Sequence, residues 1–196
     1  MATALFAAIV AVLVAPSNPG QAPPPPPALD YFPQKWKEFT YESDNMRVRF
    51  PAAPKLTTKI QPLSFGTETS RVYSHRSFIE LNLSVYEYAP AVDFEKTPDI
   101  LQRIREEGLA RNGKFSPQII KEADIMIDGY AGKFIHLEAS NGEVLRCKYF
   151  VTKNRMYFMY ASVKKGSKHG TNYENDFEKV AMAFLDSLRL ITPKLP

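Results

Sequence analysis

The feature that most constrains the fold is a strict alternation of apolar and polar side chains between positions 78 and 88. Ile79, Leu81 and Leu83 fall on one side of an extended chain, whereas Asn82 and Ser84 fall on the other. Side chains alternate between the two faces of a β-strand, so this period of two predicts a half-buried strand in an antiparallel sheet.

Similar patterns, bounded by proline, glycine or asparagine, recur on both sides of this segment. We expect further strands over residues 46–50, 55–61, 68–75, 118–128, 133–139, 143–152 and 156–163. Asn141-Gly142 is the strongest hairpin signal in the chain, because both residues tolerate the positive φ that a tight primed turn requires. The chain therefore predicts two runs of antiparallel strands.

One helix is expected after each run of strands. The first covers 98–112, with Pro98 in its first turn and Asn112-Gly113 at its end. The second begins near Tyr173, and its apolar residues recur at spacings of three and four as far as Leu188. These elements predict an α+β fold: an antiparallel sheet of about six to eight strands with two main helices packed on its faces, an α/β/α-like sandwich.

The first 22 residues have the pattern of a secretory signal peptide. No side chain between Met1 and Leu29 is charged, and the stretch from Ala2 to Ala15 is almost entirely apolar. That stretch is too short for a comfortable membrane span, but it fits the apolar region of a leader. We expect cleavage after Ala22, with cleavage after Ala15 as the less favoured site. A buried N-terminal helix or an uncleaved anchor is the alternative.

Residues 23–30 are expected to form a proline-rich linker. Pro23 to Pro27 are five consecutive prolines, which favour a stiff polyproline II spacer. A ligand for a domain with an aromatic groove is the alternative interpretation. The remaining residues, 31–196, are expected to form one domain that is exported to the periplasm or the exterior and has no membrane span after cleavage.

Charge and cysteine content exclude some classes of function. The net charge is +4, and charges of both signs are interspersed, which argues against a nucleic-acid-binding protein. The single cysteine, Cys147, excludes an intrachain disulfide. It shares a strand face with Leu145 and Tyr149, so we expect a small buried core side chain and not a nucleophile.

The chain carries no motif of a known catalytic or cofactor-binding class. It lacks a nucleophile elbow, a phosphate-binding loop, a dinucleotide fingerprint and a zinc-protease helix. Its three histidines are too few to predict a metal site. We therefore expect no catalytic residues, no cofactor, no metal and no enzymatic activity.

The weak candidates for a binding site are His75, His136 and Glu138. In the expected strand 133–139, His136 and Glu138 share a face, so the carboxylate could orient the imidazole for general-base work. A polar outward face with cross-strand pairs is the alternative. If the strands of His75 and His136 are neighbours, Glu80 could join the same cluster. His169 lies in a basic, glycine-bounded segment and is expected to be a solvated loop residue.

Several short motifs follow one another in a recognisable order. They are Trp36 to Phe39, Phe50-Pro51-Ala52-Ala53-Pro54, Ile127 to Gly132, Asn154 to Tyr157, and Phe184 to Leu188. This order resembles a group of exported bacterial domains, mostly uncharacterised, that is similar in fold to the PsbP/Mog1 superfamily, and the resemblance covers residues 36–190. Because known members are accessory or adaptor proteins, it implies a non-catalytic role.

These observations predict a non-catalytic, exported domain that binds an unidentified protein or assembly of the cell envelope, without nucleic acid and as a monomer. Two alternatives stay open. One is a carrier of a lipid or small ligand, and the other is a hydrolase that uses His136 and Glu138.

Overall fold

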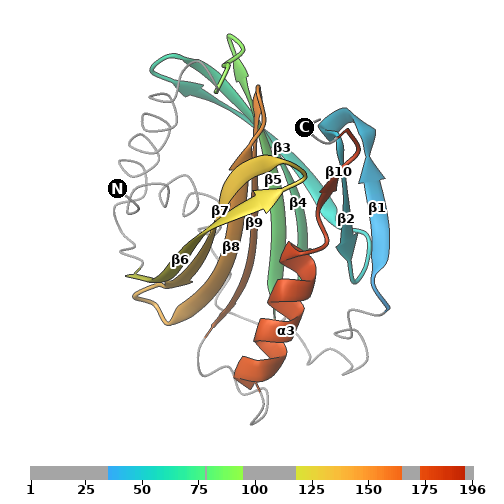
Figure 1. The fold of residues 1–196 in the computed structure, drawn as a ribbon, viewed down its shortest axis with the longest axis vertical. Coiled ribbons are helices and arrows are strands. Elements are labelled where there is room, and N and C mark those ends of the chain that lie inside the picture. Colours follow the sequence, from blue (N-terminus) through green and yellow to red (C-terminus); the bar gives the residue numbers. More distant parts are fainter. Residues whose placement is uncertain (1–34, 78, 95–117, 165–172, 193–196) are drawn as a thin grey trace, which may run out of the picture.

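The structure is a computed structural model that describes residues 35–77, 79–94, 118–164 and 173–192. Within these ranges the chain forms ten β-strands, one short 3₁₀ helix and one α-helix. Figure 1 shows the strands in two sheets, with the α-helix beside the smaller sheet. The expected leader over 1–22, the linker over 23–30, the helix over 98–112 and the loop of His169 lie outside the described residues.

Seven strands form one antiparallel sheet, the main sheet, in the order β3-β4-β5-β9-β8-β7-β6. Their bounds are β3 Lys55–Leu63, β4 Gly66–Arg76, β5 Glu80–Ala89, β6 Gln118–Ile127, β7 Tyr130–Glu138, β8 Glu143–Val151 and β9 Arg155–Lys164. β3 and β6 therefore form the two edges of this sheet, and β5 and β9 lie near its middle.

Three shorter strands form a second antiparallel sheet, the small sheet, in the order β1-β2-β10. Its members are β1 (Lys37–Tyr41), β2 (Met46–Phe50) and β10 (Arg189–Leu190). The 3₁₀ helix η3 (Glu42–Asp44) joins β1 to β2. Asn45 then reverses the chain in the left-handed region at φ 53°, where asparagine is tolerated better than most residues.

One face of the main sheet, which we call the helix face, packs against α3 (Tyr173–Leu185) and the small sheet. The helix contacts β9, β8 and β2, and it buries Phe177, Val180 and Phe184. Arg146 of β8 also lies over the Phe177 ring, 5.5 Å from its centroid, and donates to Glu178 Oε2 at 2.8 Å. Apolar burial and these charged contacts together fix the helix on the sheet.

The opposite face of the main sheet, the far face, carries a second cluster of buried side chains. Its sheet members are Tyr86, Tyr88, Ile135, Leu137, Leu145, Cys147, Met156, Phe158 and Tyr160, joined by Val92 and Phe94. β5 is therefore buried on both faces, whereas the sequence predicted a half-buried strand. Its alternate residues Asn82 and Ser84 are polar but buried, which no pattern of hydropathy could indicate.

The predicted α/β/α-like sandwich with two packed helices is wrong. The described residues are mostly strand, with a seven-stranded and a three-stranded antiparallel sheet and one α-helix. The physical reason is that residues 37–41 and 189–190 pair with residues 46–50. This pairing turns an expected isolated strand into a second sheet, which occupies part of the helix face.

The individual strands agree better with the sequence. The prediction for 46–50 coincides with β2, and each of the other seven predicted strands overlaps one strand of the main sheet. The hairpin at Asn141-Gly142 is confirmed, but only Gly142 has a positive φ there. The turn in which both residues have positive φ is Asp128-Gly129, between β6 and β7, at 48° and 85°.

Candidate functional site

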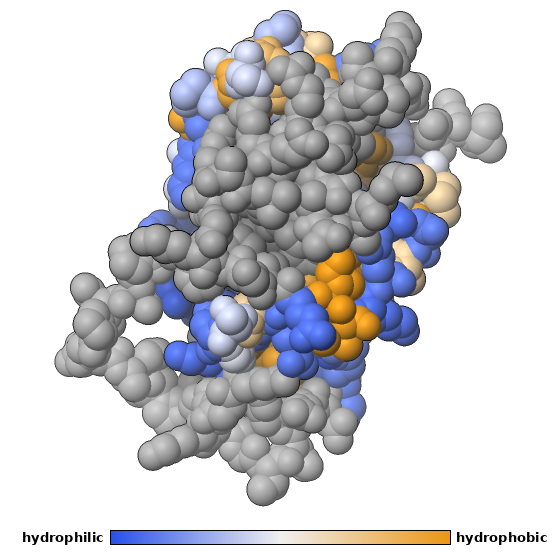
Figure 2. Space-filling view, turned by 90° about the vertical axis from the view of Figure 1, so that its left-hand side faces the viewer, coloured by the Kyte–Doolittle hydropathy of each residue, from blue (hydrophilic) through white to orange (hydrophobic). Residues whose placement is uncertain are grey.

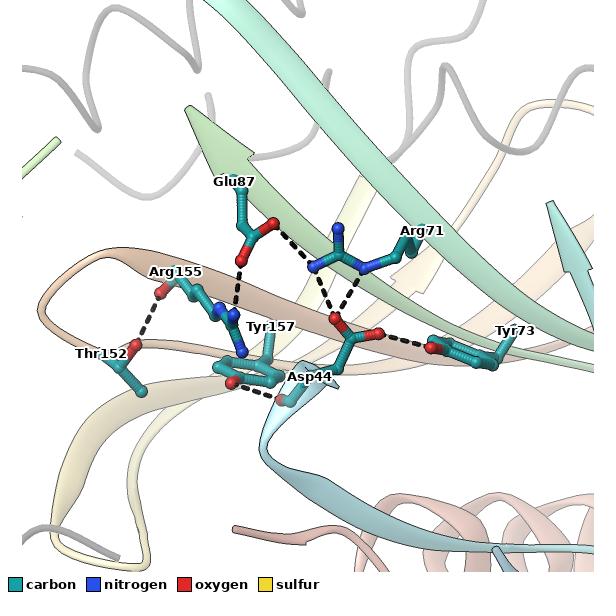
Figure 3. A network of polar contacts seen from close by, with 7 residues as sticks. All are labelled: Asp44, Arg71, Tyr73, Glu87, Thr152, Arg155 and Tyr157. Carbon is teal, nitrogen blue, oxygen red and sulfur yellow. Dashed lines mark hydrogen bonds and ion pairs between the residues drawn. The ribbon is translucent and has the colours of Figure 1, made fainter. Parts of the chain in front are cut away.

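The most highly organised polar group of the helix face surrounds Asp44, the last residue of η3. Its side chain is completely buried. Oδ1 accepts a hydrogen bond from Arg71 Nε at 2.6 Å and forms an ion pair with Arg71 Nη2 at 2.5 Å, and Oδ2 accepts a hydrogen bond from the Tyr73 hydroxyl. The Tyr157 hydroxyl donates to the backbone carbonyl of Asp44 at 2.8 Å. Figure 3 shows these donors converging on Asp44 from strands of the main sheet.

A series of ion pairs continues from Arg71 toward the surface. Arg71 Nη2 lies 2.8 Å from Glu87 Oε2, and Arg155 Nη2 lies 2.6 Å from Glu87 Oε1. We call Asp44, Arg71, Tyr73, Glu87, Arg155 and Tyr157 the Asp44 network. Its two acids and two arginines balance, so the network has no net formal charge.

The register of the main sheet explains why these residues meet. Arg71 and Tyr73 are two apart in β4 and therefore share a face. Glu87 of β5 is directly opposite Arg155 of β9, and Val85 of β5 is opposite both Arg71 and Tyr157. Cross-strand neighbours on the helix face thus place the donors where the turn after β1 delivers Asp44.

The surroundings shift the pKa of the donors in a consistent direction. Partial burial by itself lowers the pKa of Arg71, but hydrogen bonds and charge contacts with Asp44 and Glu87 outweigh burial and raise it. Burial, followed by the hydrogen bond to Asp44, raises the pKa of Tyr73 well above its ordinary value. Both groups therefore keep their protons throughout the physiological range.

This geometry is suited to holding two sheets together and not to reacting with a substrate. Both carboxylate oxygens of Asp44 already accept hydrogen bonds, and the side chain has no exposed surface. A general base or nucleophile must be able to reach the reacting atom. The Asp44 network therefore fastens η3 of the small sheet to β4, β5 and β9 of the main sheet.

A second polar group lies on the far face and differs in its hydrogen bonding. Ser84 Oγ and the hydroxyls of Tyr86 and Tyr88 are buried, and within the described part of the chain none of the three makes a well-aligned hydrogen bond, although Tyr86 lies close to Ser84 and Tyr88 lies close to Glu68. We call these three residues the hydroxyl cluster. Glu68 of β4 lies directly opposite Tyr88 and is also buried. Burial, followed by the charge of Glu68, raises the pKa of Tyr86 and of Tyr88.

The structure separates the candidate residues that the sequence suggested. His75 is in β4 and His136 is in β7, and β5, β9 and β8 lie between these two strands. At a strand spacing of about 4.8 Å, their strands are roughly 19 Å apart. Glu80 instead accepts a hydrogen bond from Tyr160 of the far face at 3.1 Å. The conditional cluster of these residues therefore does not form.

His136 and Glu138 do share one strand face, as expected. His136 lies directly opposite Arg146, the residue that contacts α3, and Glu138 lies opposite Val144. Their role in binding stays a prediction. Cys147, by contrast, is confirmed as a buried core residue, and burial raises the pKa of its thiol.

Within the described ranges, no group of three or more His, Cys, Asp or Glu side chains has an arrangement that could hold a metal ion. In the same part of the chain, no helix has the length and apolar character needed to cross a bilayer.

Sequence reasoning missed the Asp44 network because its members are distant in the sequence and belong to common residue types. The only local signal is the placement of Arg71, Tyr73 and His75 at alternate positions of β4, a pattern typical of a polar strand face. Pairing of that face with η3 depends on the small sheet, which was not predicted. No pattern in the sequence alone could have brought Asp44 to Arg71.

Comparison with known proteins adds a fold but no family. No family model and no curated protein matches the chain. Among solved structures, the chain is similar to cyanobacterial PsbP (CyanoP) from Synechocystis sp. PCC 6803, with a TM-score of 0.53 and 9% identity over 91% of this chain and 99% of that one. A Pseudomonas aeruginosa protein of unknown function gives a TM-score of 0.37 at 12% identity, covering 82% of this chain and 99% of that one.

The chain therefore has a PsbP-like fold. This finding confirms the resemblance that the order of short motifs suggested. At 9% identity the likeness concerns the path of the chain, and fold alone does not assign a function.

Proposed function

We propose that this chain is a non-catalytic, exported domain that binds a protein of the cell envelope as an accessory module. The apolar leader over 1–22 and the proline-rich linker over 23–30 support export. The PsbP-like fold agrees with the accessory role that the resemblance implies.

The observation that carries the proposal is a contrast between polar groups that are buried and hydrogen-bonded and apolar side chains that are exposed. The Asp44 carboxylate and the hydroxyls of Tyr73 and Tyr157 are hydrogen-bonded inside the Asp44 network, whereas large apolar side chains at the sheet edges are in contact with solvent. Leu56 and Ile60 of β3 are 52% and 71% exposed, and Ile120 and Met126 of β6 are 47% and 66% exposed. Figure 2 views the molecule from the side of β6 in Figure 1 and shows hydrophobic surface among hydrophilic residues. Exposed apolar surface with a polar rim is typical of interaction sites.

Export is tested by producing the full chain with a C-terminal tag in a bacterial host and sequencing the N-terminus of the recovered protein. We expect the protein in the envelope or medium, with Pro23 as its first residue. An uncleaved chain that starts at Met1 and stays in the cytoplasm would contradict this part of the proposal.

Binding is tested by capture from the envelope fraction of the source organism, followed by direct titration of each purified candidate against the full chain. The matched variants replace exposed side chains that contribute little to the core, Leu56→Ser with Ile60→Ser at one edge and Met126→Ser at the other. A saturable direct interaction weakened by one of these variants supports the proposal. Folded protein that binds no envelope component directly would overturn it.

A carrier of a small ligand is the second candidate, and the hydroxyl cluster favours it. A buried hydroxyl without a partner costs about 1–3 kcal/mol, so a ligand that accepts hydrogen bonds from Tyr86 or Tyr88 would recover part of that cost. Native mass spectrometry of the purified full chain tests this function. A bound small molecule that is lost in Tyr86→Phe would support a carrier, and a mass equal to that of the protein alone would contradict it.

A further inference from the structure

β3 is an edge strand with an unusually regular outer side. It pairs with β4 over nine consecutive residues, from Lys55 opposite Ser74 to Leu63 opposite Gly66, and this pairing contains no register shift. In the described part of the chain no strand pairs with its other side. Backbone groups on the outer side of an edge strand can accept a further strand.

The direction of those backbone groups follows from Pro62. Proline has no N–H to donate, so within a strand it is tolerated where its nitrogen points away from the neighbouring strand. Pro62 pairs in register with Thr67 of β4 and therefore points its nitrogen outward. Backbone groups alternate in direction along a strand, so the N–H groups of Leu56, Thr58 and Ile60 also point outward.

The side chains of β3 divide into an apolar row and a basic row. Leu56, Thr58 and Ile60 lie on the helix face, opposite Tyr73, Arg71 and Thr69. Lys55 and Lys59 lie on the far-face side and are exposed, and the strand has no acidic residue. Neither lysine is in an ion pair with any residue that the structure describes.

We propose that β3 binds an extended acidic segment of the partner protein, which adds to the main sheet as a further strand. Its apolar side chains would cover Leu56 and Ile60, and its alternate acidic side chains would face Lys55 and Lys59. Backbone hydrogen bonds give such a complex its affinity, and the two rows of side chains give its specificity. This inference rests on the proposed function, because it names the surface and the chemistry of the partner.

The same charges disfavour a second copy of this chain as the partner of β3. A second copy of β3 would bring Lys55 and Lys59 of both copies to one seam, and like charges across strands are destabilising. The opposite edge, β6, has a register shift between Ile119 and Lys121, and its Glu122 and Asp124 are already paired with Lys133. A bulge of this kind interrupts regular pairing, so β3 is the better edge for strand addition.

The test titrates the full chain, labelled for NMR, with a short peptide that alternates valine with glutamate. The control peptide has lysine in place of glutamate. We expect only the acidic peptide to bind, with slowed hydrogen exchange at the amides of Leu56, Thr58 and Ile60. The double variant Lys55→Glu and Lys59→Glu should lower the affinity for the acidic peptide by about tenfold and should make the basic peptide bind, because two cross-strand charge pairs change sign.

Two further variants separate strand addition from a general charge effect. Thr58→Pro removes an outward N–H without removing a hydrogen bond to β4, so it should abolish binding in a folded protein. Met126→Ser, at the opposite edge, should leave binding unchanged. Equal binding of both peptides, binding of neither, protection confined to β6, or self-association abolished by Thr58→Pro would each overturn the proposal.

Failure of this inference can be distinguished from failure of the proposed function. If an envelope protein binds the full chain directly, and Thr58→Pro binds it equally well, the accessory function stands and the assignment to β3 is wrong. If that protein loses affinity for Thr58→Pro but not for Met126→Ser, both the function and its surface are supported.

Discussion

The two faces of the main sheet bury hydroxyl groups in opposite ways. On the helix face, the carboxylate and hydroxyls of the Asp44 network donate and accept hydrogen bonds within the network. On the far face, the hydroxyl cluster is equally buried but makes no well-aligned hydrogen bond within the described residues. Because a satisfied buried group stabilises and an unsatisfied one destabilises, residues of the same type should respond differently to substitution on the two faces.

The largest expected effect is at Asp44. Asp44→Asn removes the charge that faces Arg71 and leaves the guanidinium, which is only 19% exposed, to Glu87 alone. Removal of one partner from a buried ion pair costs about 3–5 kcal/mol, and we expect a loss of that size in the free energy of unfolding, measured in urea. The matched control is Glu87→Gln, whose side chain is 33% exposed and which should cost less than about 1 kcal/mol. Equal losses in the two variants would show that Asp44 is not the centre of the network.

A smaller loss is expected when only one donor is removed. Tyr73→Phe keeps the ring that packs against Tyr41, at a centroid distance of 4.2 Å, but deletes the hydroxyl that donates to Asp44. A hydrogen bond to a charged group contributes about 1.5–3 kcal/mol, and denaturant unfolding should show that loss. If the double variant with Asp44→Asn loses the sum of the two single effects, the residues are independent and the network interpretation is wrong.

Stability at alkaline pH should show the burial of a single tyrosine on the far face, Tyr86. Burial raises the pKa of Tyr86, so the folded state keeps this proton when the unfolded state begins to lose it near pH 10. The contribution of the raised Tyr86 pKa to the free energy of unfolding is therefore fully present below about pH 10. It is lost as the pH rises toward the pKa that Tyr86 has in the folded state.

The slope of stability against pH measures this contribution. Above pH 10, stability of the wild type should fall more steeply than that of Tyr86→Phe, by about 1.4 kcal/mol per pH unit. The two slopes should coincide near neutral pH. Unfolding titrations at several alkaline pH values, with tyrosinate absorbance as a second readout, provide the measurement. Parallel slopes above pH 10 would mean that Tyr86 ionises in the folded protein as readily as in the unfolded one.

The sequence predicted the main sheet far better than the arrangement around it, for a physical reason. Alternation within a strand and turn residues such as Gly142 and Asp128-Gly129 are local signals. The small sheet depends on pairing between β2 and β10, whose partners Arg47 and Arg189 are distant in the sequence. Such non-local pairing leaves no periodic pattern in a strand of two residues.

The Asp44 network could not be predicted from the sequence for the same reason, because it depends on the small sheet. Arg71 and Tyr73 could be placed on one strand face from the sequence, but Asp44 reaches them only through the turn after β1.

The hydroxyl cluster could not be predicted for another reason. Ser84 and Tyr86 alternate with apolar residues in β5, a pattern that indicates a solvated face, and only the second core cluster shows that this face is buried.

The smallest expected effect is at Tyr86, and it is the most direct test of the difference between the two faces. Tyr86→Phe deletes a buried hydroxyl that makes no well-aligned hydrogen bond among the described residues and keeps the ring within the second core cluster. Because no well-aligned hydrogen bond is lost, the free energy of unfolding at neutral pH should change by less than about 0.5 kcal/mol or should rise. The matched comparison is Tyr73→Phe, the same chemical change on the helix face. A loss at Tyr86 as large as that at Tyr73 would mean that the hydroxyl is hydrogen-bonded in solution, and the far face would then hold a polar group as well satisfied as the Asp44 network.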